Sequence, residues 1–212
     1  HQSIISNRLK VLSGQKKPCH KIIIVSANAL FNRLPPPTYI NAHTLSLKIG
    51  DHIKYENILR ELFQNGYRKV SQVEEHGEYA TRGSLLDIYP MGTNKPLRIE
   101  IYDDSIESLR YFNTDTQLTE KKIVAIDILP AKEIPLDEKS IRYFRSCYRE
   151  KFEGNPTDSQ LYLDISNGIS HGGIEYYLPL FFDNTATFFD YFSKDNLIIA
   201  PNNLIDILTK YW

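Results

Sequence analysis

Residues 97–102 alternate strictly between apolar and polar side chains, and this alternation limits what the surrounding chain can fold into. Leu97, Ile99 and Ile101 alternate with Arg98, Glu100 and Tyr102. Successive side chains of a β-strand point to opposite faces, so a period of two is typical of a half-buried strand. The segment therefore predicts a strand with an apolar face toward a core and a polar face toward water or a partner.

The segments on both sides of this strand favour a small antiparallel sheet. Residues 84–89 are a second strand candidate that ends at Pro90, and residues 106–112 are a third. The loop 91–96 contains a Gly and an Asn, which suit a hairpin connection, and the acidic pair 103–104 suits the next turn. Together these signals predict at least three neighbouring strands.

Two interpretations of the polar face stay open. Antiparallel sheets commonly leave one face in water, so Arg98 and Tyr102 fit an ordinary solvated face. In that interpretation Arg98 forms a cross-strand ion pair with an acid such as Glu107, and Arg82 is a turn residue beside Gly83. The same residues also fit a binding surface, because Arg and Tyr are among the residue types that most often dominate protein interfaces.

The rest of the chain predicts helices and strands in an order that is typical of an α/β protein. Helices are expected over 4–12, 27–34, 55–64 and 137–152, from 157 or 158 to about 168, and from 202 or 203 to about 210. Further strands are expected over 22–25, 45–49, 67–73, 124–129 and 197–200. The β-branched run 22–25 has no polar alternation, which favours a buried parallel strand, and Asp137 suits the N-cap of the helix that follows it. Residues 42–122 are therefore predicted to form a compact α+β unit inserted into a second domain.

The charge balance and the missing motifs argue against several functions. The chain carries 25 Lys and Arg against 26 Asp and Glu, and residues 42–123 carry 11 against 13. A protein that relies on phosphate contacts usually has a basic surplus, so DNA binding by this segment alone is disfavoured. A phosphate-binding loop needs Gly-Lys-Ser or Gly-Lys-Thr in its motif, and neither occurs in the sequence. The chain is therefore not expected to bind or hydrolyse ATP.

Composition gives expectations about compartment and context. No run of about 18 apolar residues is present, which predicts no membrane span. Cys19 and Cys147 are isolated and have no metal-ligand spacing, nor has any pair of the six His residues, so we expect no metal site and reduced thiols in a cytoplasmic protein. The chain begins at His1 and its only Met is Met91, so we expect part of a longer protein.

The segment 77–112 resembles a known family. It contains GEYATRGSLLDIYPMG followed by PLRIEIYDDSIESLRYF, which is similar to the small inserted domain shared by the bacterial repair protein UvrB and the transcription-repair coupling factors, the Mfd family. Three stretches are similar to the Mfd family in particular: HQSIISNRLKVL, GYRKVSQVEEHGEYATRG and GGIEYYLPLFF. The resemblance covers nearly the whole chain and weakens over 153–170 and after 193.

This resemblance implies a fold and a role. It implies a degenerate helicase-like parallel-sheet domain, residues 1–41 plus 123–212, interrupted by a small inserted α+β domain with an antiparallel sheet, residues 42–122. It also implies a module that recruits UvrA, that has no enzymatic activity or cofactor of its own, and that is monomeric. ATP and Mg²⁺, RNA polymerase and double-stranded DNA are expected only for the translocase domains of full-length family members, which displace stalled RNA polymerase.

The family motif also implies which residues face UvrA, namely Arg82, Arg98 and Tyr102. Arg82 stands in ATRG and Arg98 in PLRIEIY, while at position 102 Phe is common in the family and Tyr stands here. An Arg fork suits a partner carboxylate, and an aromatic ring supplies apolar contact area. The reversal Arg98→Glu is expected to weaken UvrA binding while the fold survives, because the apolar face of the strand is untouched.

Three alternatives stay open. UvrB itself would carry a phosphate-binding loop and a Tyr-rich hairpin, and neither is present in this sequence. A direct DNA-binding module of a UvrB-like excision repair protein would bind with a steep salt dependence. An active nucleotidase would turn over ATP.

Overall fold

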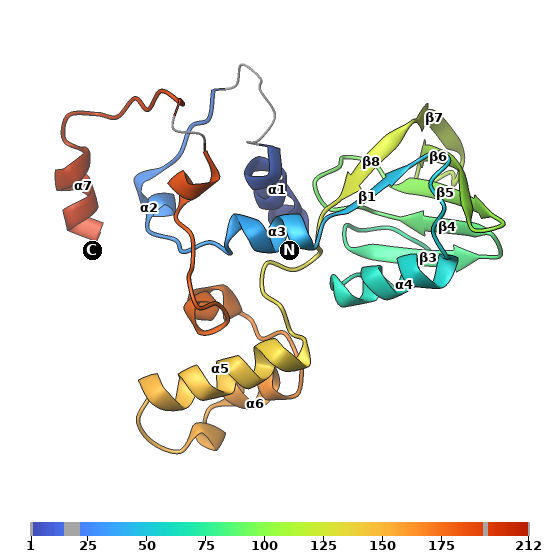
Figure 1. The fold of residues 1–212 in the computed structure, drawn as a ribbon. Helices are drawn as coiled ribbons and strands as arrows, with labels where there is room; N and C mark the ends of the chain where they lie inside the picture. Colours follow the sequence, from blue (N-terminus) through green and yellow to red (C-terminus); the bar gives the residue numbers. More distant parts are fainter. Residues whose placement is uncertain (1, 15–21, 193–194, 212) are drawn as a thin grey trace. The chain divides into compact units, whose positions relative to one another are not determined.

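The computed structural model describes residues 2–14, 22–192 and 195–211, and the chain forms two compact units (Figure 1). The first unit comprises residues 1–11 and 40–133, and the second comprises residues 12–39 and 134–212. The first unit thus contains the whole predicted segment 42–122 together with chain on both sides of it. The assignment of 42–122 as an inserted domain in a helicase-like host stays a prediction.

A six-stranded sheet dominates the first unit. Its strands in spatial order are β2 Arg68–Lys69, β3 Glu78–Arg82, β4 Leu85–Ile88, β5 Leu97–Tyr102, β6 Ser105–Phe112 and β7 Thr119–Ile123. Every neighbouring pair is antiparallel except β2 and β3, which are parallel. The predicted antiparallel sheet is therefore confirmed, whereas the expected strand 67–73 is only two residues long and β7 was not predicted.

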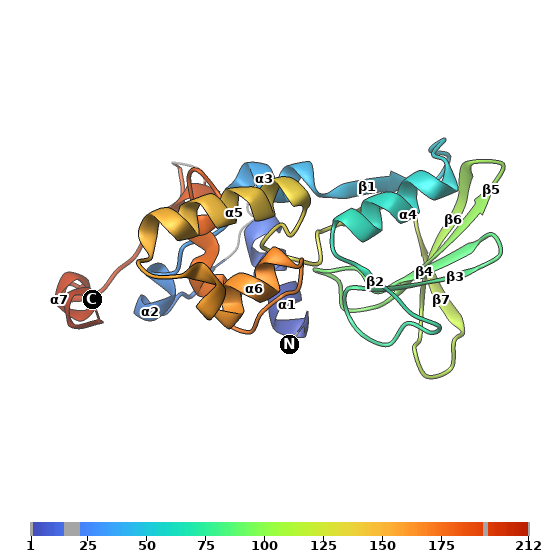
Figure 2. The ribbon, with the colours of Figure 1, turned by 90° about the horizontal axis from the view of Figure 1, so that it is seen from below.

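The core of this unit lies between the sheet and the helix α4, Tyr55–Gln64 (Figure 2). Ile58 and Leu62 are one helical turn apart on α4, and both are fully buried. The alternating strand residues Leu97 and Ile99 are fully buried as well. The apolar half of the 97–102 pattern therefore lies in a core, as predicted.

The first unit also contains a separate two-stranded sheet. It pairs β1 Leu45–Lys48 with β8 Ala125–Ile128 in antiparallel register. The hydroxyl of the buried Tyr67 donates to the carbonyl oxygen of Leu129 at 2.7 Å and accepts from the amide of Met91 at 3.1 Å. Because these contacts join segments far apart in the sequence, they fix the end of β8 against the loop after β4.

Helix α1, Gln2–Ser13, is tied to the same loop. The amide of Gly92 donates to Ser6 Oγ at 2.8 Å. Gly92 has a φ of +81°, and a Cβ built there would lie 2.8 Å from Leu129 Cδ1. Gly suits this turn because an L side chain would be strained at this φ and would also displace the end of the Leu129 side chain.

The second unit is mainly helical. It contains α2 Ala27–Leu30, part of α3 Pro37–Ala42, α5 Glu138–Lys151, α6 Gln160–Ser166 and α7 Leu204–Tyr211, and the 3-10 helices Pro156–Asp158, Ile174–Leu180 and Phe188–Tyr191. The predicted cap of α5 is confirmed, since Asp137 Oδ1 accepts from the amide of Ser140 at 3.0 Å. Its core holds Phe144 of α5, which stacks on Phe181 with ring centroids 5.0 Å apart.

Two predicted strands of this unit are wrong. Residues 22–25 and 197–200 form no strand, and Ile22 and Ile24 each expose 93% of their surface. A parallel strand needs hydrogen-bonded neighbours and helices on both faces, and neither segment has a strand partner among the described residues. The strand expected at 124–129 exists as β8, but it pairs with β1 in the first unit.

The mixed α/β class of the chain is confirmed. The helicase-like parallel sheet stays a prediction. Residues 22–25 and 197–200, which were expected to be strands of it, form no strand in the structure.

Cys147 is half-buried and unpaired, and Cys19 lies outside the described residues.

Candidate functional site

The candidate site is the face of the six-stranded sheet that carries the polar half of the alternating pattern, called the open face below. Side chains directly opposite each other in an antiparallel pair point to the same face. One row of opposite residues runs Arg82, Leu85, Glu100 and Ser108. The next row runs Ala80, Asp87, Arg98, Arg110 and Lys122. The register therefore assembles one charged face from five strands, β3 to β7.

Arg98 is held firmly within this face. Its Nε donates to Asp87 Oδ1 at 2.7 Å, and its Nη2 donates to Asp87 Oδ2 at 2.9 Å. Its Nη1 donates to the carbonyl oxygen of Gln117 at 3.1 Å, and its Cζ lies 4.8 Å from the centre of the Phe112 ring. The hydrogen bonds with Asp87 raise the pKa of Arg98, although partial burial acts in the opposite direction. The side chains of Arg98 and Asp87 are only 17% and 5% exposed.

A second charged group lies beside this pair. Glu100 Oε2 accepts from Ser108 Oγ at 3.0 Å and lies 3.6 Å from Arg110 Nη2. Arg110 stands directly opposite Arg98. Asp87 thus lies beside Arg98 and Glu100 beside Arg110, and these two carboxylates limit the repulsion between the two guanidinium groups.

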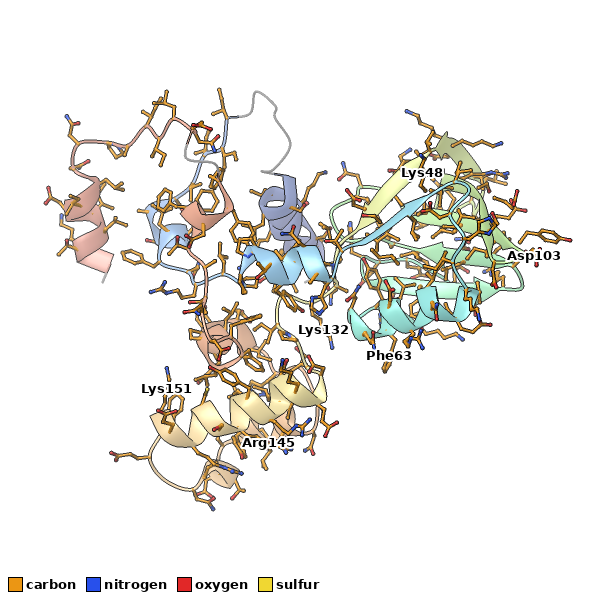
Figure 3. All side chains as sticks on the ribbon, viewed as in Figure 1. Lys48, Phe63, Asp103, Lys132, Arg145 and Lys151 are labelled. Carbon is orange, nitrogen blue, oxygen red and sulfur yellow. The ribbon has the colours of Figure 1, made fainter. Side chains whose placement is uncertain are left out.

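Arg82 and Tyr102 lie at one end of the open face, where two hairpins turn. Arg82 precedes the turn between β3 and β4, and Tyr102 precedes the two-residue turn Asp103–Asp104. The amide of Ile101 donates to the carbonyl of Ser84 at 3.0 Å, so the first turn lies beside the end of β5. Arg82 is exposed and Tyr102 is 72% exposed, and Figure 3 shows Asp103 at the outer edge of this unit.

Asp103 and Asp104 adopt φ angles of 48° and 55°. Positive φ at both central residues is the geometry of a tight hairpin turn that matches the twist of the strands, and Asp tolerates it better than most residues. The turn therefore fixes the end of β5 and presents the Tyr102 ring to solvent.

The structure places the three sequence-predicted residues on one face but in two environments. Arg82 and Tyr102 are exposed and accessible to a partner. The guanidinium of Arg98 instead donates most of its hydrogen bonds to groups within the protein. The suggested ion pair between Arg98 and Glu107 is wrong, because Glu107 occupies a β-bulge: Glu100 faces Ser108 and the next residue, Ile101, faces Ile106. Whether the three residues bind UvrA stays a prediction.

Asp87 was not predicted as the partner of Arg98. A signal was present, because an acid alternates with apolar residues in Leu86, Asp87, Ile88 and must point away from the core. Pairing the strand 84–89 with 97–102 through the loop 91–96 would have suggested a cross-strand acid and base. The contacts with Gln117 and Phe112 have no comparable local signal.

The described part of the chain shows neither a group of metal ligands nor a membrane-spanning helix. Within residues 2–14, 22–192 and 195–211, no three His, Cys, Asp or Glu side chains are grouped so that they could hold a metal ion. In the same residues, no helix has both the length and the apolar character needed to cross a membrane.

Comparison with known proteins gives two findings. Residues 45–134 match the family described as the UvrB interaction domain, and this range includes every strand of the six-stranded sheet. The chain is also 43% identical to the transcription-repair-coupling factor of Haemophilus influenzae and 40% identical to that of Escherichia coli, in each case over 96% of the chain. The transcription-repair-coupling factor of Rickettsia bellii is 31% identical over 98% of the chain.

These findings confirm the resemblance to the transcription-repair coupling factors. The chain spans about 18% of the length of these relatives. The open face lies within the segment that matches the UvrB interaction domain, so the family match and the candidate site coincide.

Proposed function

We propose that this chain is a UvrA-recruiting module of a transcription-repair coupling factor and that its open face is the UvrA-binding surface. The observation that carries the proposal is the match of residues 45–134 to the UvrB interaction domain, because this segment builds the whole open face. The similarity to transcription-repair-coupling factors along 96% of the chain supports the same context.

The chemistry of the open face fits a protein partner. An exposed Arg and an exposed Tyr stand together at one end of the sheet, and these residue types often anchor interfaces. The Arg82 guanidinium can donate two parallel hydrogen bonds to a carboxylate, and the Tyr102 ring offers apolar area with a polar edge. We infer that UvrA contributes an acidic side chain beside an apolar contact.

The proposal assigns no catalytic step to this chain. ATP-driven translocation on DNA and the displacement of stalled RNA polymerase are proposed for the rest of a full-length protein, together with ATP and Mg²⁺. We propose that this chain acts in the cytoplasm without a cofactor and without hydrolysing ATP, because its sequence has no phosphate-binding loop.

Titration of UvrA with the 212-residue chain by calorimetry tests the proposal. The wild-type chain is expected to bind, and the exposed substitutions Arg82→Glu and Tyr102→Ala are expected to weaken binding at unchanged melting temperature. Asp127→Asn is a matched control, because Asp127 accepts from Ser46 on the separate two-stranded sheet. No binding of UvrA by the wild-type chain contradicts the proposal, and salt-dependent binding of duplex DNA instead favours the DNA-binding alternative.

Arg98→Glu is a poorer probe than the sequence suggests. The new carboxylate would face the buried carboxylate of Asp87, so two like charges would share a half-buried site. We therefore expect this variant to lose stability as well as binding, and the two losses could not be separated.

A further inference from the structure

We propose that Asp87 is a positioning residue of the open face. In this proposal the buried carboxylate of Asp87 fixes the Arg98 guanidinium in one orientation, so that Arg98 presents its remaining N–H groups to an acceptor on UvrA. The inference rests on the proposed function and adds a residue and a mechanism to it.

The register of the sheet gives Asp87 this position. Asp87 on β4 stands directly opposite Arg98 on β5, and its two carboxylate oxygens accept separate hydrogen bonds at 2.7 and 2.9 Å. On its other side Asp87 faces Ala80, whose side chain offers no hydrogen bond. The Asp87 side chain is 5% exposed, so it is not itself available to a partner protein.

Three groups together determine the orientation of the guanidinium. Asp87 holds the edge that carries Nε and Nη2, the carbonyl of Gln117 holds Nη1, and the ring of Phe112 lies under the plane. Gln117 itself has a φ of +59° in the loop between β6 and β7, which aims its carbonyl at Arg98. An Arg has five N–H donors, and three of them are used here, which leaves two.

This arrangement makes Arg98 a pre-oriented donor. A long side chain normally loses rotamer freedom when it enters an interface, and this loss weakens binding. Arg98 has already lost that freedom in the free protein, so an acceptor on UvrA meets two fixed N–H groups. A Lys could not replace it, because an ammonium lacks the planar fork that reaches Asp87 and Gln117 at once.

The competing explanation is that Asp87 only stabilises the fold. The two explanations differ in a double-mutant cycle, since a positioning residue acts through Arg98 and loses its effect when Arg98 is replaced. A residue that only stabilises the fold lowers the free energy of unfolding but leaves the affinity of the folded chain for UvrA unchanged. A residue that contacts UvrA directly keeps its effect on affinity when Arg98 is replaced.

The experiment measures the affinity of the 212-residue chain for UvrA with Asp87→Asn, Arg98→Gln and both changes together. Asp87→Asn is expected to weaken binding about tenfold, which corresponds to about 1.4 kcal/mol. In the Arg98→Gln background the same change is expected to have no further effect. Asp127→Asn serves as the matched Asp-to-Asn control and is expected to bind like the wild type.

A spectroscopic measurement tests the orientation without UvrA. In the wild-type chain the Arg98 Nε–H is expected to give a resolved, slowly exchanging signal in a proton–nitrogen correlation spectrum, because its hydrogen bond is shielded from water. Asp87→Asn is expected to move this signal and speed its exchange. Asp87→Glu keeps the carboxylate and is expected to restore both the signal and part of the affinity, which also provides a test should the Asn variant fail to fold.

The outcomes separate this inference from the proposed function. A wild-type chain that does not bind UvrA overturns both. A wild-type chain that binds, with an Asp87→Asn variant that binds equally well, overturns only the positioning role. Equal losses from Asp87→Asn in the wild-type and Arg98→Gln backgrounds overturn it too.

Discussion

The two faces of the six-stranded sheet are built from the same strands but carry different kinds of side chain, apolar on one face and charged on the other. On the covered face Leu86 and Leu97 are fully buried, while on the open face their immediate neighbours Asp87 and Arg98 form an ion pair. A step of one residue along a strand thus changes a residue from a core position to a position in the candidate site. The covered face supplies fully buried apolar side chains to the core, and the open face carries the charged side chains and the exposed Arg82 and Tyr102 of the candidate site.

The largest expected effect comes from the covered face. Ile99→Ala should lower the free energy of unfolding by about 2–5 kcal/mol, because a fully buried side chain is truncated and leaves a cavity. Urea denaturation measures this change. Tyr102→Ala, at an exposed position on the same strand, is the matched control. A small loss of stability for Ile99→Ala would mean that this face is not a packed core.

Asp87→Asn should have a smaller effect on stability. We expect a loss of about 1–3 kcal/mol in the free energy of unfolding, because Arg98 keeps one acceptor but loses the compensating charge. The same denaturation experiment compares it directly with Ile99→Ala. If Asp87→Asn were the more damaging change, the open face and not the covered face would dominate stability.

Glu78, on the open face, makes the stability of the fold sensitive to acid. Burial acts to raise the pKa of Glu78, but the amides of Glu74 and Glu75, both at 2.9 Å, and the neighbouring Arg68 lower it overall, below the ordinary value of 4.5. A carboxyl whose folded-state pKa is lowered stabilises the fold fully above its unfolded pKa, and the contribution is lost as the pH falls through the folded pKa.

Melting temperatures measured from pH 7 down to about pH 3 check this expectation. The wild-type chain should lose stability in the acid range, and Glu78→Gln should show a flatter profile in that range together with lower stability at neutral pH. Identical pH profiles for the two proteins would mean that Glu78 makes no such contribution.

Tyr102→Ala should have the smallest effect on stability. The ring is 72% exposed, so we expect a change within about 0.5 kcal/mol in the free energy of unfolding. Binding to UvrA should nevertheless weaken, because an exposed aromatic side chain contributes little to folding and much to an interface. Urea denaturation measures the free energy of unfolding, and calorimetry measures the affinity for UvrA. An unchanged affinity would place the interface away from this end of the sheet.

Local patterns determined much of the fold from sequence. The alternation at 97–102 identified β5 and its buried face, and the apolar stripe of 55–64 identified α4, because both depend on the fixed periods of strand and helix. Asp137 was recognisable as an N-cap because its carboxylate needs only a backbone amide three residues away. These features require no knowledge of distant chain segments.

Tertiary structure alone decided the environment of each site residue. The sequence indicated that Arg98 and Tyr102 share a face, but the partner of Arg98 depended on the pairing of β4 with β5 and on the bulge at Glu107. Likewise, the apolar run 22–25 had the composition of a buried strand, yet a strand needs neighbours that composition cannot supply. Side-chain period is a local property, whereas register and burial are properties of the partners that the fold brings alongside.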